Sequence, residues 1–488
     1  MRRLLAILLS LVLLAAGPAW AQGQPPPGLT DQELISFYEM PTGDVGYLVV
    51  DLADGTVLAS HNPDQTFIPA SVAKVPTVIG ALGILGGQHR FATGLYTTGI
   101  EAGGVLSGDL YLRGGGDPFL SADNLQDLAQ RLAARGVTRI DGSFYYDASQ
   151  YIDHPQINPG QPQAAGYNTG VSALSVNFNR IRVRWRNGGG SVSASASAVT
   201  DNLVVPLNEI GFSTAPAGTP VGAPYQRAGA LSEDRWLLSP GLPSEGEDWL
   251  PVGNPPLLAA LILRELAADE GVTLPAPLPG PTPLEAREMA VHDSFTLRAI
   301  AREVLRFSNN MSAELLGLAA SRGLTSVALP LDQSADVLGV WLQQNIPGTD
   351  WTGFHLDNHS GLSSASRISP DQMIAMLRLA QRPIGGTLLD EILRDMSWEA
   401  LDDLNNPSIE VRAKTGTVAY ARGLAGYIDA ASGRRLAFAV FTTDFYRRSV
   451  HDATFDPRQR YSSGDSREWL GRARALEEHL VAGWAARF

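Results

Sequence analysis

Hydrophobic and polar positions change their spacing twice near the start of the chain. Residues 46–52 and 56–59 are short apolar stretches separated by Asp54-Gly55, which predicts a β-hairpin. From Ser71 the apolar spacing becomes helical, and it stops at Gly86-Gly87. The sequence therefore places the Ser71 hydroxyl at a helix N-terminus, where free backbone N–H groups and the helix dipole favour negative charge.

The C-terminal part of the chain also mixes helical and strand patterns. Apolar residues over 297–305 recur at helical spacing and lead into Ser308-Asn309-Asn310. The further predicted elements are a strand after Lys414, strands over Gly423–Asp429 and Leu436–Thr442, and a last helix over about Arg467–Ala485. This mixture predicts an α+β fold in which an antiparallel sheet is flanked by helices.

Residues 88–285 have a different sequence pattern, with short apolar stretches and many Gly and Pro. The predicted elements are strands over 109–113 and 180–186, a Gly/Ser-rich loop over 187–198, a helix over 257–268 and a linker over 275–283. Four arginines alternate along 180–186, and a solvated strand face is favoured for them over a surface that binds an anionic polymer. We expect residues 88–285 to be a β-rich insert in a domain formed by residues 29–87 and 286–488.

The N-terminus has the pattern of a cleaved secretory signal. Two arginines precede an apolar run over residues 4–16, and Ala19-Trp20-Ala21 fits the small-x-small rule for signal peptidase. The run is shorter than the roughly 20 residues of a membrane-spanning helix, although an uncleaved anchor is the alternative. We therefore predict a signal peptide over residues 1–21, a Pro-rich tether over 22–28, no integral membrane segment after signal removal and a periplasmic location.

Composition excludes several classes of function. Without the two arginines of the signal, 35 basic residues stand against 50 acidic ones, and this net charge of about −15 argues against nucleic-acid binding. The chain has no cysteine, which excludes thiol catalysis, disulfides and a lipid anchor on cysteine. The histidines show no metal-ligand spacing and the chain has no phosphate-loop motif, so we expect no cofactor.

Lysine is almost absent from this chain. Only Lys74 and Lys414 occur among 488 residues, beside 35 arginines, and they lie in the short motifs Ser71-x-x-Lys74 and Lys414-Thr415-Gly416-Thr417. Arginine stays protonated, whereas a buried lysine can lose its proton and act as a base. Three residues apart on a helix, Ser71 and Lys74 can touch, so Lys74 can activate the Ser71 hydroxyl as a nucleophile.

The charged and polar residues of the later motifs complete a predicted site for acyl transfer. Lys414 would lower the pKa of Lys74 and attract a substrate carboxylate. Ser308 is expected to bridge the two amines and relay a proton to the leaving amine. The Asn310 amide is expected to bind a substrate backbone amide.

The strand after Lys414 supplies the predicted substrate-binding surface. Gly416 allows a substrate to approach the backbone closely, and the hydroxyls of Thr415 and Thr417 can bind a carboxylate. Backbone N–H groups of Ser71 and Thr417 would then form the oxyanion hole.

The order Ser-x-x-Lys, Ser-x-Asn and Lys-Thr-Gly resembles that of penicillin-binding proteins and class A β-lactamases. The 233 residues between Lys74 and Ser308 are typical of one branch. This branch is the low-molecular-mass class C penicillin-binding proteins, which are D-alanyl-D-alanine carboxypeptidases/endopeptidases of peptidase family S13. Further matches cover nearly the whole chain after the signal: Pro69–Ser71, Gly116–Leu120, Tyr146–Ser149, Ala313-Glu314 and Ser360–Ser363.

The resemblance implies a penicillin-recognising transpeptidase/β-lactamase-like domain that is split by two nested small domains. It also implies substrate-binding roles for Asp147 and Ser360. Ser364 stands where many relatives have an arginine that helps to recognise the diamino-acid side chain of the cell-wall peptide, and Arg367 is a candidate substitute. His359 is disfavoured as a general base, because Lys74 already fills that role.

These observations predict an extracytoplasmic serine D,D-peptidase. Ser71 would attack the carbonyl between the terminal D-alanines of a peptidoglycan stem peptide, and penicillins and other β-lactams would acylate the same serine. A β-lactamase or esterase on the same fold is an alternative that fast deacylation would distinguish. A non-catalytic wall-binding protein is a second alternative, which the complete motif set disfavours, and no particular oligomeric state is predicted.

Overall fold

The computed structural model describes residues 24–216, 224–459 and 464–488. The predicted signal peptide and the first two residues of the predicted tether lie outside the described residues, and residues 24–28 have no regular secondary structure. The chain divides into two compact units. We call residues 24–88, 297–455 and 464–488 the discontinuous unit, and residues 89–216, 224–296 and 456–459 the central unit.

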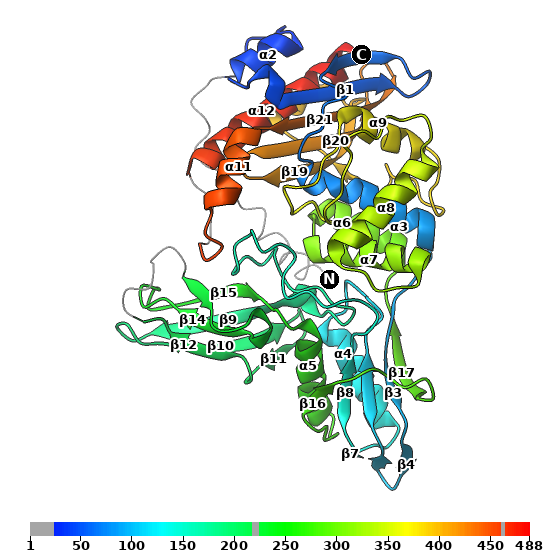
Figure 1. Cartoon of the computed structure of the whole chain (residues 1–488), viewed down its shortest axis with the longest axis vertical. Coiled ribbons are helices and arrows are strands. Elements are labelled where there is room, and N and C mark those ends of the chain that lie inside the picture. The colour runs from blue at the N-terminus through cyan, green and yellow to red at the C-terminus, as the bar shows by residue number, and fades with distance from the viewer. Residues whose placement is uncertain (1–23, 217–223, 460–463) are drawn as a thin grey trace. The chain divides into compact units, whose positions relative to one another are not determined.

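The discontinuous unit is built on a six-stranded antiparallel sheet with the order β18-β19-β20-β21-β1-β2 (Figure 1). Its strands are β1 Val45–Asp51, β2 Val57–His61, β18 Arg394–Asp395, β19 Glu410–Val418, β20 Ala421–Asp429 and β21 Arg435–Thr443. The predicted hairpin is confirmed as β1 and β2, which pair antiparallel. The strands predicted over Gly423–Asp429 and Leu436–Thr442 are confirmed as β20 and β21. The strand predicted after Lys414 is β19, which begins earlier, at Glu410.

One face of this sheet is covered by helix α12, Gly464–Arg487, which packs with helix α2, Asp31–Phe37. Trp484 of α12 is fully buried against Tyr47 and Phe438, with ring centroids 5.2 and 6.3 Å away. Its indole Nε1 donates to Asp31 of α2 at 2.9 Å. This aromatic cluster attaches helices α2 and α12 to the same sheet face.

The opposite face carries the helices that include the first two motifs. These elements are the 3-10 turn η2 Ala70–Ala73 and helices α3 Lys74–Leu85, α6 Leu297–Phe307, α7 Asn310–Thr325, α8 Leu331–Asn345 and α9 Pro370–Leu379. Helix α3 packs against α7, which packs against α8, and η2 packs against β19 and β20. Smaller elements of this unit are η1 Thr42–Asp44, α10 Glu399–Asp402 and α11 Phe445–Thr454.

The central unit contains four small sheets and two helices. The sheet orders are β16-β8-β6-β3-β17, β11-β10-β9-β15, β12-β14-β13 and β4-β5-β7. The strands are β3 Ala92–Thr97, β4 Ile100–Ala102, β5 Val105–Ser107, β6 Leu110–Arg113, β7 Arg139–Asp141, β8 Phe144–Asp147, β9 Arg180–Asn187, β10 Val192–Val199, β11 Val204–Pro206, β12 Gly211–Thr214, β13 Tyr225–Arg227, β14 Arg235–Leu238, β15 Glu245–Pro251, β16 Pro277–Pro279 and β17 Arg287–Asp293. The remaining elements are helices α4 Ala122–Ala134 and α5 Pro255–Asp269 and the 3-10 turns η3 Asn177–Asn179 and η4 Leu231–Glu233.

Two predictions for the central unit were wrong. The predicted Gly/Ser-rich loop contains strand β10, in which small apolar residues alternate with serine and face a buried cluster. The predicted linker contains β16, which pairs with β8. Strand β10 consists mostly of small residues and β16 contains two prolines, so both have little intrinsic strand preference. Pairing with neighbouring strands stabilises them instead.

The four arginines that alternate along β9 were predicted to form a solvated strand face, but they are not all exposed. Arg180 is 2% exposed, and burial lowers the pKa of its guanidinium to about 10. Arg184 is exposed and pairs with Glu247 at 2.9 Å. This row of arginines therefore includes a core residue as well as surface ones.

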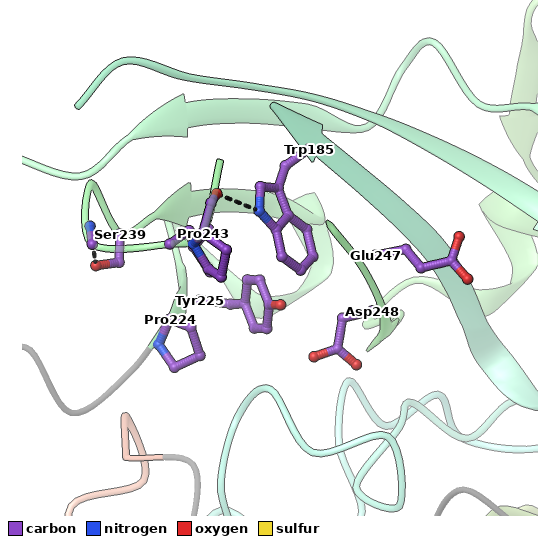
Figure 2. Close-up of a pocket in the computed structure, with 9 residues that line it drawn as sticks. Trp185, Pro224, Tyr225, Ser239, Pro243, Glu247 and Asp248 are labelled. Atoms are coloured by element: carbon purple, nitrogen blue, oxygen red, sulfur yellow. Dashed lines mark hydrogen bonds between the residues drawn. The ribbon is translucent and has the colours of Figure 1, made fainter. Parts of the chain in front are cut away.

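A cavity of about 410 Å³ lies in the central unit beside β9 (Figure 2). Trp185 and Tyr225 line it together with Glu247 and Asp248, and the Trp185 indole donates to the Pro243 carbonyl at 3.2 Å. Neither Lys74 nor Lys414 is among its lining residues, so this cavity is not the site that the sequence motifs predict. Within the described parts of the chain, no helix has the length and apolar character needed to span a bilayer.

Candidate active site

Ser71 and Lys74 lie where a 3-10 turn meets a helix. Ser71 is in η2, and Lys74 is the first residue of α3. The Lys74 side chain is completely buried, and its Nζ lies 2.9 Å from Ser71 Oγ. The predicted contact between these two residues is therefore present.

The Lys74 amine has two further partners, and both are oxygen atoms that only accept hydrogen bonds. Nζ donates to the Asn310 side-chain oxygen at 2.7 Å and to the Ser360 backbone carbonyl at 2.7 Å. A neutral amine has two N–H bonds and one lone pair. If the two oxygens take the N–H bonds, the lone pair is directed to the third partner, the Ser71 hydroxyl.

A helix cap and a glycine with positive φ bring these groups together. Asn309 caps α7 by accepting from Ser312 N at 2.9 Å, which fixes Asn310 as the first residue of the helix. Gly361 has φ 72°, and a Cβ there would lie 1.8 Å from the Ala70 carbonyl oxygen. Only glycine lets the Ser360 loop approach the backbone before Ser71 this closely.

Glu314, one turn along α7 from Asn310, binds the backbone of the same loop. Its carboxylate accepts from the backbone N–H groups of His359 and Ser360, each at 3.0 Å. The side chain is fully buried. The sequence prediction gave Glu314 no role, although its i, i+4 spacing from Asn310 would place the two side chains on one helix face.

The buried charges shift one another's pKa values. Burial, and then the Lys414 charge, lower the pKa of Lys74 well below its ordinary value, whereas the Glu314 carboxylate raises it. Burial and then Arg394 lower the pKa of Lys414 to about 7. The predicted effect of Lys414 on Lys74 is present, but desolvation is the larger cause.

Strand β19 passes directly beside η2. A Cβ on Gly416 would lie 2.4 Å from the Pro69 carbonyl and 3.0 Å from Ser71 N. A Cβ on Gly423, opposite Gly416 on β20, would lie 2.7 Å from the Phe441 ring and 3.1 Å from a methyl group of Val72. Two glycines in register thus create the space in which the serine turn lies against the sheet.

The outer edge of β19 is open next to this turn. Strand β18 pairs only with Arg412 and Ala413, and among the described strands no other one covers the edge from Lys414 to Val418. An unpaired strand edge of this kind can accept an extended peptide as an added strand.

The side chains of the third motif vary in exposure. Lys414 is buried, and its Nζ donates to its neighbour's carbonyl, that of Thr415, at 2.6 Å. Thr415 and Thr417 are half-buried, and Thr417 Oγ1 accepts from Arg422 Nη1 at 3.2 Å. Ser71 lies in η2 and Thr417 in β19, the two elements that contact each other at Gly416, so their backbone N–H groups belong to adjacent elements.

Ser308 does not make the contact that the sequence predicted. Ser308 lies between α6 and α7 with φ 58°, and its backbone N–H donates to the Val304 carbonyl at 2.9 Å, as in a further turn of α6. Among the described residues, its hydroxyl is not hydrogen-bonded to Lys74 or Lys414. A proton relay through Ser308 therefore stays a prediction.

Comparison with known proteins identifies the family of this site. The D-Ala-D-Ala carboxypeptidase 3 (S13) family matches residues 31–458, and that span includes the serine turn, the start of helix α7 and strand β19. The chain belongs to the S13 family. The predicted family and enzyme class are confirmed.

Individual S13 relatives cover most of the chain. A D-alanyl-D-alanine carboxypeptidase of Actinomadura sp. (strain R39) is 28% identical over 89% of this chain and 84% of its own length. The D-alanyl-D-alanine carboxypeptidase DacB of Haemophilus influenzae is 23% identical, with coverage of 85% and 89%. The crystal structure of penicillin-binding protein 4 (dacB) from Haemophilus influenzae matches with a TM-score of 0.73 and 20% identity, covering 92% of this chain and 99% of that one. This likeness confirms the predicted fold class.

Two residues that the S13 resemblance suggested for substrate binding have contacts of another kind. Asp147 belongs to the central unit, and its carboxylate accepts from the backbone N–H groups of Ser149 and Thr282 at 2.9 and 2.7 Å. Ser360 is fully buried and contacts Lys74 through its backbone carbonyl. Substrate-binding roles for their side chains stay predictions.

His359 is a core residue of this S13 chain. Its Nε2 lies 2.8 Å from Ser334 Oγ, and burial lowers its pKa to about 3. Its backbone carbonyl accepts from Thr77 of α3 at 2.8 Å. These contacts agree with the prediction that His359 is not the general base.

Ser364, which the resemblance placed at an arginine position of many relatives, donates a hydrogen bond to a carboxylate. Its Oγ donates to Asp452 at 2.7 Å, and Asp452 is also paired with Arg448. Arg367 donates to the Ser364 carbonyl and lies over the Phe445 ring, 5.2 Å from its centroid. Arg367 thus fastens its own loop to α11.

Proposed function

We propose that this chain is a serine-type D-alanyl-D-alanine carboxypeptidase/endopeptidase that acts on peptidoglycan stem peptides through an acyl-enzyme at Ser71. The observation that supports this most strongly is the set of three partners around the Lys74 amine. Two acceptor oxygens hold its N–H bonds, and the third partner is a hydroxyl that can give up its proton. Membership of the S13 family supports the same reaction class.

In the proposed acylation step, Lys74 takes the Ser71 proton while Oγ attacks the carbonyl between the two terminal D-alanines. The lowered pKa of Lys74 favours the neutral amine that this step requires. Backbone N–H groups of Ser71 and Thr417 stabilise the oxyanion of the tetrahedral intermediate. The amide bond then breaks, the proton passes to the leaving amine, and water later hydrolyses the ester on Ser71.

The open edge of β19 is the proposed binding surface for the stem peptide. A peptide added along Lys414–Val418 would form backbone hydrogen bonds with the strand and place its scissile carbonyl near Ser71. The Asn310 amide lies beside Lys74 and would bind a substrate backbone amide. Lys414, Thr415 and Thr417 would receive the terminal carboxylate.

β-Lactams are proposed as inhibitors that acylate the same serine. Support comes from the structure of the Haemophilus influenzae penicillin-binding protein 4 that was solved in complex with a β-lactam, which matches this chain with a TM-score of 0.71. We further propose a periplasmic location after removal of residues 1–21, and we propose that the central unit is the inserted region predicted over residues 88–285.

Digestion of purified sacculi tests this function. The mature protein should release D-alanine from monomeric stem peptides and reduce the amount of cross-linked dimers, and the two products are measured separately by chromatography. Ser71→Ala is the matched control because it removes one oxygen atom and leaves Lys74 in place. Equal product from the variant, or no product from the wild type, would contradict the proposal.

A further inference from the structure

Arg422 and Glu477 form a buried ion pair beside strand β19 that the proposed mechanism does not use. Arg422 lies on β20, directly opposite Thr417 of β19. Its Nε donates to Glu477 Oε2 at 2.8 Å, and its Nη1 donates to Thr417 Oγ1 at 3.2 Å. The Arg422 side chain is 12% exposed and that of Glu477 is 0% exposed. The Thr417 hydroxyl is therefore linked through Arg422 to a buried carboxyl group, whose pKa burial raises to about 7.

The guanidinium of Arg422 determines which hydrogen bond the Thr417 hydroxyl has left to make. A hydroxyl has one O–H donor and two acceptor lone pairs, and a guanidinium can only donate. The Arg422 bond therefore occupies a lone pair of Thr417 and leaves its O–H for another acceptor. Because the donor is charged, it also polarises the hydroxyl and strengthens the bond that the O–H makes. An anion gains most from such a donor.

Glu477 fixes the guanidinium in this position. It comes from α12, and its carboxylate binds the Nε side of Arg422 while Nη1 reaches Thr417. The planar arginine fork can serve both partners at once, whereas a lysine has a single ammonium group. Burial of an arginine without a partner would be strongly unfavourable, so Glu477 is what allows Arg422 to stay at this place.

We propose that Arg422, held by Glu477, is a positioning residue that makes the Thr417 hydroxyl a donor to the terminal carboxylate of the substrate. Arg422 thereby sets the preference of the enzyme for peptides with a free C-terminus. This inference rests on the proposed function, in which the substrate binds along the edge of β19 and its carboxylate meets Thr417. It adds a specificity determinant that lies on the neighbouring strand and acts through Thr417.

The test compares two peptides that differ only at the C-terminus. One is diacetyl-L-lysyl-D-alanyl-D-alanine, and the other is the same peptide with a terminal carboxamide. The ratio of their kcat/KM values measures the contribution of the carboxylate. Arg422→Met should reduce this ratio about ten- to a hundredfold, the usual contribution of one hydrogen bond to a charged group. The loss should come from a higher KM for the free acid, with the carboxamide peptide nearly unchanged.

Arg422→Lys keeps a cation beside Glu477. This variant is used for the same comparison if the methionine variant does not fold. It should also reduce the ratio, at an unchanged melting temperature. Arg434→Lys is the control, because Arg434 is half exposed and lies 3.7 Å from Asp51. If Arg422 acts through Thr417, Arg422→Lys should reduce the ratio no further in a Thr417→Val background.

The possible outcomes separate this inference from the proposed function. A wild-type protein that hydrolyses neither peptide contradicts the proposed function. An active wild type whose ratio is unchanged in Arg422→Lys contradicts the inference alone. So does a variant that loses activity equally on both peptides, because that result indicates a general structural role.

Discussion

At the scale of single residues, the two lysines are both buried amines, but their contacts suggest different tasks. Lys74 contacts the proposed nucleophile, while Lys414 lies on the strand beside it and contributes charge. Lys74→Arg keeps a charge and removes the base, so the second-order rate of acylation by a labelled penicillin should fall by about two to four orders of magnitude. Lys414→Arg keeps the proposed charge, so its acylation rate should fall less than that of Lys74→Arg. An equal loss, or a larger one at Lys414, would show that the base has been assigned to the wrong lysine.

The sequence was most informative about residues whose chemistry is rare in this chain. Lys74 and Lys414 could be singled out because arginine is used almost everywhere else. Arg422 and Glu477 could not, because their pairing depends on the register of β19 with β20 and on a helix 55 residues further along. The contact predicted for Ser308 was not found, since the motif gives its spacing but not the left-handed backbone at that position.

At the scale of elements, the loop around His359 is held by several packed helices. The His359 ring fits over Gly317 of α7, where a Cβ would lie 2.0 Å from the ring, and it reaches Ser334 of α8. Gly317→Ala should therefore displace the loop whose Ser360 carbonyl binds Lys74. We expect a loss of about 1–3 kcal/mol in the free energy of unfolding, together with slower acylation by penicillin.

Gly339→Ala on α8 is the matched control for this substitution, because its Cβ would meet Phe354 only at an ordinary contact distance of 3.4 Å. Chemical denaturation and the acylation rate should both stay close to wild type in that variant. Wild-type behaviour of Gly317→Ala itself would contradict the account of the loop.

Helices and strands with strong apolar patterns were predicted well, and weakly patterned ones were not. Helix α5 has Asn254 as its N-cap and two prolines in its first turn, and each signal was visible in the sequence. Strand β10 alternates serine with alanine or valine, which gives little intrinsic strand preference. Its conformation depends on β9 and β11 on either side.

At the scale of the whole molecule, the site should lower stability in a way that depends on pH. The pKa of Lys414 is lowered from 10.5 to about 7 in the folded protein, chiefly by burial. As the pH falls from about 10.5 to 7, the unfolded chain keeps a proton that the folded chain has lost, so the folded state loses stability. Lys414→Met should remove this effect. Its gain in unfolding free energy should be on the order of a few kcal/mol at pH 7 and smaller at pH 10.

Denaturation curves of the wild type and Lys414→Met at the two pH values check this sign. A gain that is larger at pH 10, or no gain at pH 7, would show that the buried amine is not destabilising. The expected result would mean that the enzyme gives up stability to keep a titratable amine in its site.

The central claim is that Ser71, activated by Lys74, is the residue that forms the acyl-enzyme. Mass spectrometry after incubation with a saturating penicillin tests it most directly, first on the intact protein and then on its peptides. The account predicts one adduct per chain, located on Ser71, and none in Ser71→Ala. An adduct on another residue, or one that persists in the variant, would contradict it.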